Sequence, residues 1–144
     1  MTPIGLVTCI SSFGPKEMMD RLAAAVTSRG ISIMAGIDHA AAAAAIGMEL
    51  RPTEVLIFGN PRAGTPFMQA VQTVGIDLPL KALVWQDEGG TTRLAYNDPQ
   101  WLAQRHGVGA GLDRTLRAIA DALAAVAREA TAASAEEELA QRFD

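Results

Sequence analysis

The sequence has a single cysteine, Cys9, among its 144 residues, and it has no cluster of lysine and arginine. One thiol can form neither an internal disulfide nor a metal site of several cysteines, so we expect Cys9 to be an ordinary buried thiol. The 12 basic side chains are outnumbered by 16 acidic ones, which gives a net charge of −4. Binding to duplex nucleic acid needs clustered basic side chains that neutralise phosphates, so the sequence predicts no nucleic-acid partner.

Long apolar runs are also missing. No window reaches the roughly 18 uninterrupted apolar residues that a membrane span needs, and residues 1–13 have neither a basic start nor a long apolar stretch. We therefore predict a cytoplasmic protein with no membrane partner. The two histidines, His39 and His106, have no cysteine to complete a ligand set. The sequence accordingly predicts no metal ion and no cofactor.

What the sequence does contain is enough apolar material for one folded domain. Apolar residues make up 49% of the chain and charged residues 19%, with a mean hydropathy of +0.16. A chain of this length and composition folds as one unit, and we assign residues 1–130 to a single domain. Residues 131–144 are rich in alanine and glutamate. They are predicted to be an acidic tail or a short final helix.

The order of predicted elements indicates the fold class. Strand patterns cover residues 4–10, 31–37, 54–58, 78–87 and 91–97, and helix patterns begin at Pro15, after Asp38, at Thr65–Pro66, at Pro99 and at about Leu112. Strand and helix alternation alone favours a parallel sheet. The short turn over residues 87–90, however, makes the last two strands an antiparallel hairpin. We therefore predict an α+β domain with a curved, mostly antiparallel sheet of about five strands backed by helices.

One stretch resembles a phosphate-binding loop without its central residue. Residues 59–65 follow an apolar strand, precede a helix, and have two glycines at the right spacing with a threonine after the second. No lysine stands between Gly64 and Thr65, and Pro61 and Pro66 remove two backbone donors that a phosphate cradle uses. Nucleotide hydrolysis is thus not expected. A small anion near this helix start, assisted by Arg62, is still compatible with the pattern.

Lys81 is the unusual residue of the fourth predicted strand. Alternation places it on the same face as Leu83 and Trp85, which are apolar. A lysine on an apolar face lies at the edge of the sheet, extends its ammonium group past the apolar side chains into water, or pairs with a carboxylate or a bound anion. The sheet edge is the simpler interpretation.

Six short motifs together resemble the family known as domain of unknown function 302. In chain order they are Asp38-His39-Ala40, Leu50-Arg51-Pro52-Thr53, Phe58-Gly59-Asn60-Pro61, Gly64-Thr65-Pro66, Leu78-Pro79-Leu80-Lys81 and Tyr96-Asn97-Asp98-Pro99. The resemblance covers about residues 4–125. It implies a compact α+β domain, similar to a curved antiparallel sheet backed by helices and usually found as a homodimer, and it implies no particular reaction.

The polar residues of these segments define a candidate pocket. We predict that the chain is a non-catalytic module that binds a small anionic or amphipathic ligand in a cleft beside the sheet. The candidate ligand-binding residues are Asp38, His39, Asn60, Arg62, Lys81, Tyr96 and Asn97. Two alternatives are an enzyme that uses His39 as general acid or base, and a purely structural homodimeric domain.

Asn60 itself has two interpretations. Because Pro61 follows it, Asn60 is expected to have an extended backbone at the end of a strand. Its side chain then either contacts a ligand or only bonds the backbone of its own turn. Dimerisation is expected for a separate reason. Two long amphipathic helices and apolar strands together present more apolar surface than one sheet layer can cover.

Overall fold

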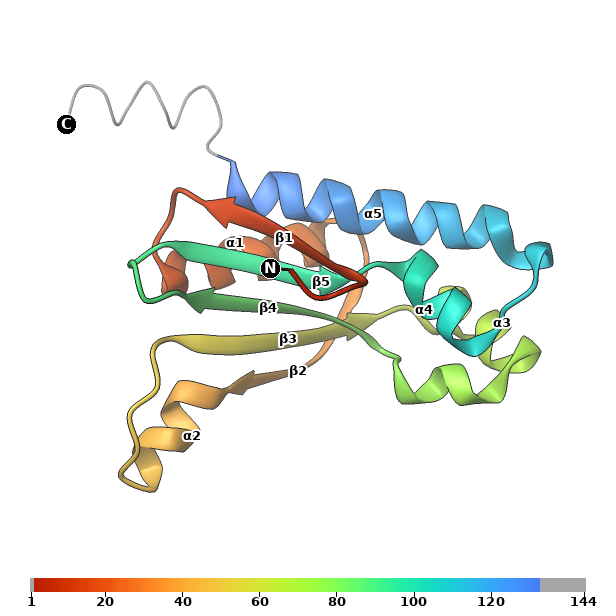
Figure 1. Cartoon of the computed structure of the whole chain (residues 1–144). Coiled ribbons are helices and arrows are strands. Elements are labelled where there is room, and N and C mark those ends of the chain that lie inside the picture. The colour runs from red at the N-terminus through yellow and green to blue at the C-terminus, as the bar shows by residue number, and fades with distance from the viewer. Residues whose placement is uncertain (1, 133–144) are drawn as a thin grey trace.

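The computed structural model describes residues 2–132, and Figure 1 shows their arrangement. The strands are β1 (Leu6–Ser11), β2 (Ser32–Asp38), β3 (Thr53–Gly59), β4 (Leu80–Gln86) and β5 (Thr92–Asn97). The helices are α1 (Pro15–Ser28), α2 (His39–Ala45), α3 (Pro61–Ala70), α4 (Pro99–His106) and α5 (Asp113–Thr131), with short 3-10 helices η1 (Gln72–Ile76) and η2 (Ala110–Leu112).

The strands form one open sheet in the order β1-β5-β4-β3-β2. All four neighbouring pairs are antiparallel, which confirms the predicted α+β class and the single domain. The β4–β5 hairpin turns at Asp87, whose carboxylate accepts hydrogen bonds of 3.0 Å from the backbone N–H groups of Gly89 and Thr91. Only β2 is irregular, with a shift in its pairing to β3 between Ile33 and Ala35.

Helices α1 and α5 cover one face of the sheet, and no helix within residues 2–132 covers the other face (Figure 1). Met18 and Leu22 of α1 and Val126 of α5 are buried against Phe58 and Leu94 of the sheet. These residues recur at helical spacing on their helices and at alternate positions on their strands, so one face of each element meets the same core.

The remaining helices lie at opposite ends of the sheet. Helices α3, η1 and α4 gather where β3 ends and β4 begins, whereas α2 extends from the far end of β2 (Figure 1). This separation follows from the antiparallel β2–β3 pair, in which Ser32 lies opposite Gly59 and Asp38 lies opposite Glu54. A segment that leaves β2 therefore starts at the other end from one that leaves β3.

The predicted helix starts after Asp38 and at Pro99 are confirmed. The Asp38 side chain caps α2 by accepting a hydrogen bond of 2.9 Å from the backbone N–H of Ala41. Asp98 caps α4 at Pro99, and Gly107 ends that helix in the left-handed conformation with φ of 69°. Such a conformation favours glycine, because other residues are strained there.

The predicted start of the third helix is wrong. Helix α3 begins at Pro61 instead of Pro66, and residues 61–64 are helical instead of forming a loop. Asn60 and Pro61 are themselves a capping residue followed by proline, and the first such pair starts the helix. Pro66 lies inside the helix, where its missing N–H removes one intrahelical hydrogen bond.

The sheet-edge interpretation of Lys81 is also wrong. Lys81 lies in β4, the central strand, opposite Ile57 of β3. Its face is the one without helices, as the alternation with buried Ala82 predicts. Helix α5 ends at Thr131, so the predicted acidic tail falls almost entirely on residues outside those described.

Candidate functional site

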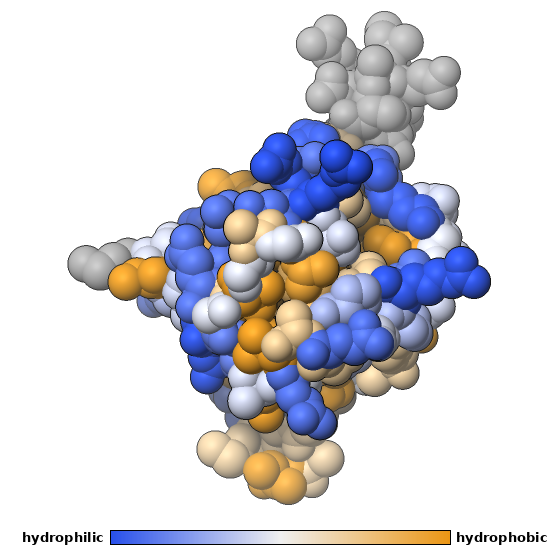
Figure 2. Space-filling view, turned by 90° about the vertical axis from the view of Figure 1, so that its right-hand side faces the viewer, coloured by the Kyte–Doolittle hydropathy of each residue, from blue (hydrophilic) through white to orange (hydrophobic). Residues whose placement is uncertain are grey.

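A pocket of about 240 Å³ lies at the α3–α4 end of the sheet. Its walls come from α3, η1, α4 and α5, from the ends of β3 and β4, and from Met34 of β2. Figure 2 looks onto this end of the molecule, where apolar side chains gather in the middle of the face with hydrophilic side chains around them.

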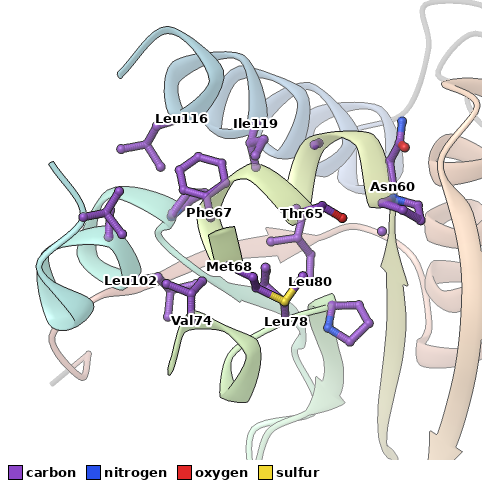
Figure 3. Close-up of a pocket in the computed structure, with 18 of the residues that line it drawn as sticks. Asn60, Thr65, Phe67, Met68, Val74, Leu78, Leu80, Leu102, Leu116 and Ile119 are labelled. Carbon is purple, nitrogen blue, oxygen red and sulfur yellow. The ribbon is translucent and has the colours of Figure 1, made fainter. Parts of the chain in front are cut away.

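Almost all of the pocket lining is apolar. Figure 3 shows side chains from α3, η1, α4, α5 and β4 pointing toward one another across the pocket. The larger apolar lining residues are Met34, Phe67, Met68, Val74, Leu78, Leu80, Leu102, Leu116 and Ile119. The apolar stripe of α5 thus serves two purposes, since its second half fills the core while Leu116 and Ile119 face the pocket.

Two polar side chains line the pocket, Asn60 and Thr65. Neither is titratable, and no titratable side chain lines the pocket walls. The Asn60 side-chain oxygen accepts a hydrogen bond of 3.0 Å from the backbone N–H of Arg62. Asn60 has the extended backbone that proline demands of its predecessor, with φ of −135° and ψ of 117°. The helix cap therefore fixes a carboxamide at the pocket rim.

The pocket does not bring together the residues that were predicted to share it. Of the seven candidates, only Asn60 lines it. Asp38 and His39 lie at the other end of β2, because Asp38 pairs with Glu54, five residues before Gly59. Five residues of strand separate the two ends by roughly 17 Å. Within one chain, the prediction of a shared cleft for Asp38, His39 and Asn60 is wrong.

Two other candidates lie on the uncovered face of the sheet. Ala82 pairs with Tyr96, so the neighbouring Lys81 lies beside Asn97, and Asn97 in turn pairs with Leu6 of β1. Both side chains are half-buried. They are neighbours, as predicted, but they lie outside the pocket lining.

Tyr96 points to the covered face and is part of the core, with 8% of its surface exposed. Burial raises the pKa of its phenol, and the nearby Cys9 and Asp98 raise it further. Burial also raises the pKa of the Cys9 thiol. Both groups are therefore neutral at physiological pH, which suits a packing role. Arg62, the remaining candidate, is exposed at the start of α3.

A polar cluster that the sequence did not indicate lies beside the pocket. His106 Nε2 is 2.5 Å from Asp77 Oδ2, and His106 Nδ1 is 2.9 Å from the Thr73 hydroxyl. Arg105 donates to both carboxylate oxygens of Asp77 at 3.0 and 2.8 Å. The cluster joins η1 to the end of α4, and the neighbouring Val74 lines the pocket. Its pairs are about 30 residues apart in sequence, so no local motif announces them.

The charge state of Asp77 follows from its partners. Burial by itself raises the pKa of this carboxyl, but the hydrogen bonds and charges of His106 and Arg105 outweigh burial and leave the pKa below its ordinary value of 3.8. An ionised Asp77 accepts a hydrogen bond from the N–H at Nε2, and the Thr73 hydroxyl is the hydrogen-bond partner of Nδ1. Every polar atom of the histidine is therefore bonded, which suits a structural clamp.

The other end of the β2–β3 pair is acidic. Glu54 lies opposite Asp38, and the pKa of Glu54 is raised by burial and then by the negative charges of Asp38 and Asp20. Among residues 2–132, no three histidine, cysteine or acidic side chains are grouped so that they could hold a metal ion. Nor does any helix in this part of the chain combine the length and apolar character that crossing a bilayer requires.

Comparison with known proteins finds relatives of similar sequence. The chain is 45% identical over 115 residues to proteins named fluoride-specific ion channel FluC 1 in Brucella suis and Brucella abortus. The match covers 80% of this chain but only 45% and 43% of those two proteins. The chain therefore spans less than half the length of the curated relatives that it matches.

A solved structure has the same fold. An uncharacterised conserved protein from Bacillus stearothermophilus, described as DUF302, superposes with a TM-score of 0.79 at 22% identity, covering 89% of this chain and 99% of the other. The model of the family described as domain of unknown function DUF302 matches residues 7–126. The resemblance of the six motifs is thus confirmed, and the chain belongs to the DUF302 family.

Proposed function

We propose that this protein works in the cytoplasm as a non-catalytic module that binds one small ligand with an apolar body in the pocket at Asn60. The observation that carries the proposal is the lining itself, a pocket of about 240 Å³ with only Asn60 and Thr65 as polar side chains. Small-molecule sites combine apolar walls with a few fixed polar groups in this way.

The volume limits the size of the ligand. An engineered apolar cavity of roughly 150 Å³ in another protein binds benzene, and pockets for drug-sized molecules begin at roughly 300 Å³. A pocket of about 240 Å³ lies between these two. It suits a molecule with a short acyl chain or one or two rings.

The polar groups limit its chemistry. Asn60 uses its side-chain oxygen for the cap of α3, so its amide N–H groups remain for a ligand. The Thr65 hydroxyl supplies a donor and an acceptor. A hydroxyl, carbonyl or carboxylate head at this rim, with its apolar tail toward Phe67 and Leu102, fits the lining. Such a molecule is the amphipathic ligand predicted from the sequence, and its head group can be anionic or neutral.

The test is displacement of a fluorescent apolar dye. N-phenyl-1-naphthylamine should bind with one saturable site, and octanol and octanoate should each displace it. Similar affinity for octanol and octanoate would mean that the pocket recognises mainly the alkyl chain. A clear preference for octanoate would mean that a positive charge, such as that of Arg62, also binds the carboxylate. Absence of saturable dye binding would contradict the proposal.

A second candidate function rests on the channel relatives. We propose that in those proteins the part matching this chain is an accessory domain beside a channel, and that this chain serves the same purpose. The support is 45% identity over 115 residues that make up less than half of each relative. Fluoride flux would be measured in liposomes with the Brucella suis protein, whole and without the matched segment. Unchanged flux without the segment would contradict an accessory role.

We also propose that the protein is a homodimer. Nine large apolar side chains are exposed among residues 2–132, and six of them lie between residues 33 and 50, on β2, α2 and the loop that follows. A lone chain rarely leaves so concentrated an apolar surface in water. Light scattering at tens of micromolar should give twice the monomer mass, and a monomer would contradict this proposal.

A further inference from the structure

Strand β2 is an edge strand: it pairs with β3 on one side, and no strand within residues 2–132 pairs with its other side. It is the last strand of the sheet order, and all seven of its residues are exposed. By contrast, β1 at the other edge is half-buried and packs against α5. An edge strand with exposed apolar residues presents unpaired backbone groups that another strand can bond.

Helix α2, which follows β2, also lacks a covering surface. It is seven residues long and none of its residues is buried. So short a helix is marginally stable in water unless it packs against something. Its tip continues into the exposed side chains of Ile46 and Met48. In Figure 1, α2 and the turn that follows it project away from the sheet.

We propose that β2 pairs antiparallel with β2 of a second copy, so that each copy contributes the start of its α2 to the pocket rim of the other. A strand paired antiparallel with its own copy has a two-fold axis through the pair, so the same surface serves both partners. The axis would lie near Ala35 and Gly36, in the middle of the strand. The strand pairing stands without the proposed pocket function, whereas the contribution of α2 to the partner's pocket rim rests on that function.

The charges at the two ends of β2 favour this arrangement. Asp38 and Glu54 lie opposite each other at one end, where their negative charges repel. At the other end Ser32 pairs with Gly59, and the exposed Arg62 follows three residues later. Arg62 forms no ion pair within residues 2–132. An antiparallel pairing places the acidic end of each copy beside the basic end of the other.

The pairing would also complete the candidate site. With the axis at Ala35 or Gly36, the partner's Asp38 lies opposite a residue between Ser32 and Met34, and Met34 lines the pocket. Two strand spacings, roughly 10 Å, then separate the partner's Asp38 from Gly59. Asp38 and His39, which are too far from Asn60 and Arg62 within one chain, would approach them across the two-fold axis.

Disulfide trapping tests the pairing directly. In a Cys9→Ser background, Ala35→Cys and Gly36→Cys place single thiols beside the expected axis, where their Cα atoms fall within the reach of a disulfide. Ile76→Cys, equally exposed but on η1, is the matched control. Mild oxidation should cross-link the Ala35 or Gly36 variant at least about tenfold faster than the control. Equal rates would overturn the proposal, as would a monomer by sedimentation.

A charge variant gives a second readout that needs no cysteine. Arg62→Glu would place negative charge beside the partner's acidic end and should raise the dimer dissociation constant by roughly tenfold. Arg114→Glu, an equally exposed change at the start of α5, should leave it unchanged. Equal effects of the two variants would overturn the charge pairing. Dye binding is measured separately, so cross-linking without dye binding would refute the pocket function and retain the interface.

Discussion

Asn60 caps helix α3 with the same carboxamide that forms part of the pocket rim: its side-chain oxygen accepts a hydrogen bond of 3.0 Å from the backbone N–H of Arg62. The two interpretations of this residue, turn residue and ligand residue, are therefore compatible. One amide oxygen serves the helix, and the amide nitrogen remains for a ligand.

Replacement of Asn60 separates the two uses. Asn60→Ala removes the cap and should lower the free energy of unfolding by about 1 kcal/mol. Asn60→Asp retains a capping oxygen and should keep the stability while removing the amide donor. Urea unfolding and dye binding of both variants check this. If Asn60→Ala leaves stability unchanged, the cap does not stabilise the helix and the prediction fails.

The cluster around His106 should make the free energy of unfolding depend on pH in the acidic range. The folded pKa of Asp77 lies below its ordinary value of 3.8, so its ionised form stabilises the fold above that value and the benefit disappears as the pH falls through the folded pKa. Asp77→Asn should lower the free energy of unfolding by about 1–3 kcal/mol at pH 7.

Denaturant unfolding at neutral and at strongly acidic pH checks this. The deficit of Asp77→Asn relative to the parent should shrink as the pH drops below 3.8. The same deficit at both pH values would mean that the carboxylate charge is not what stabilises the contact between η1 and α4.

Gly5 should tolerate substitution less well than Gly30. Both have positive φ, 82° and 72°, which costs a residue with a side chain roughly 1–2 kcal/mol. A Cβ on Gly5 would also clash with the Trp101 ring, whereas one on Gly30 meets nothing within 4 Å. Gly5→Ala should therefore be more destabilising than Gly30→Ala by about 1–3 kcal/mol. Equal melting temperatures of the two variants would contradict the packing of Trp101 on Gly5.

The sequence predicted those features of the fold that depend on a few neighbouring residues. The helix starts after Asp38 and at Pro99 and the hairpin turn at residues 87–90 all have their cause within a few residues. The start of α3 was missed because Asn60-Pro61 and Thr65-Pro66 are both valid starts. Spacing alone does not choose between two such pairs.

The site was predicted less well, for a topological reason. Asp38 and Asn60 flank neighbouring strands, but an antiparallel pair sends such residues to opposite ends. The bond between Thr73 and His106 spans 33 residues and the one between Asp77 and His106 spans 29. No pattern in a single sequence indicates contacts of that range, because they depend on how η1 and α4 pack.

The pocket is tested most directly by filling it. Ala63 lines the pocket on α3, whereas Ala24 is exposed on α1, so Ala63→Trp and Ala24→Trp are a matched pair. Titration of both folded variants with N-phenyl-1-naphthylamine should show at least about a tenfold loss of affinity for Ala63→Trp and parental affinity for Ala24→Trp. Parental affinity in the Ala63→Trp protein would show that the dye binds elsewhere, and would contradict a ligand site at Asn60.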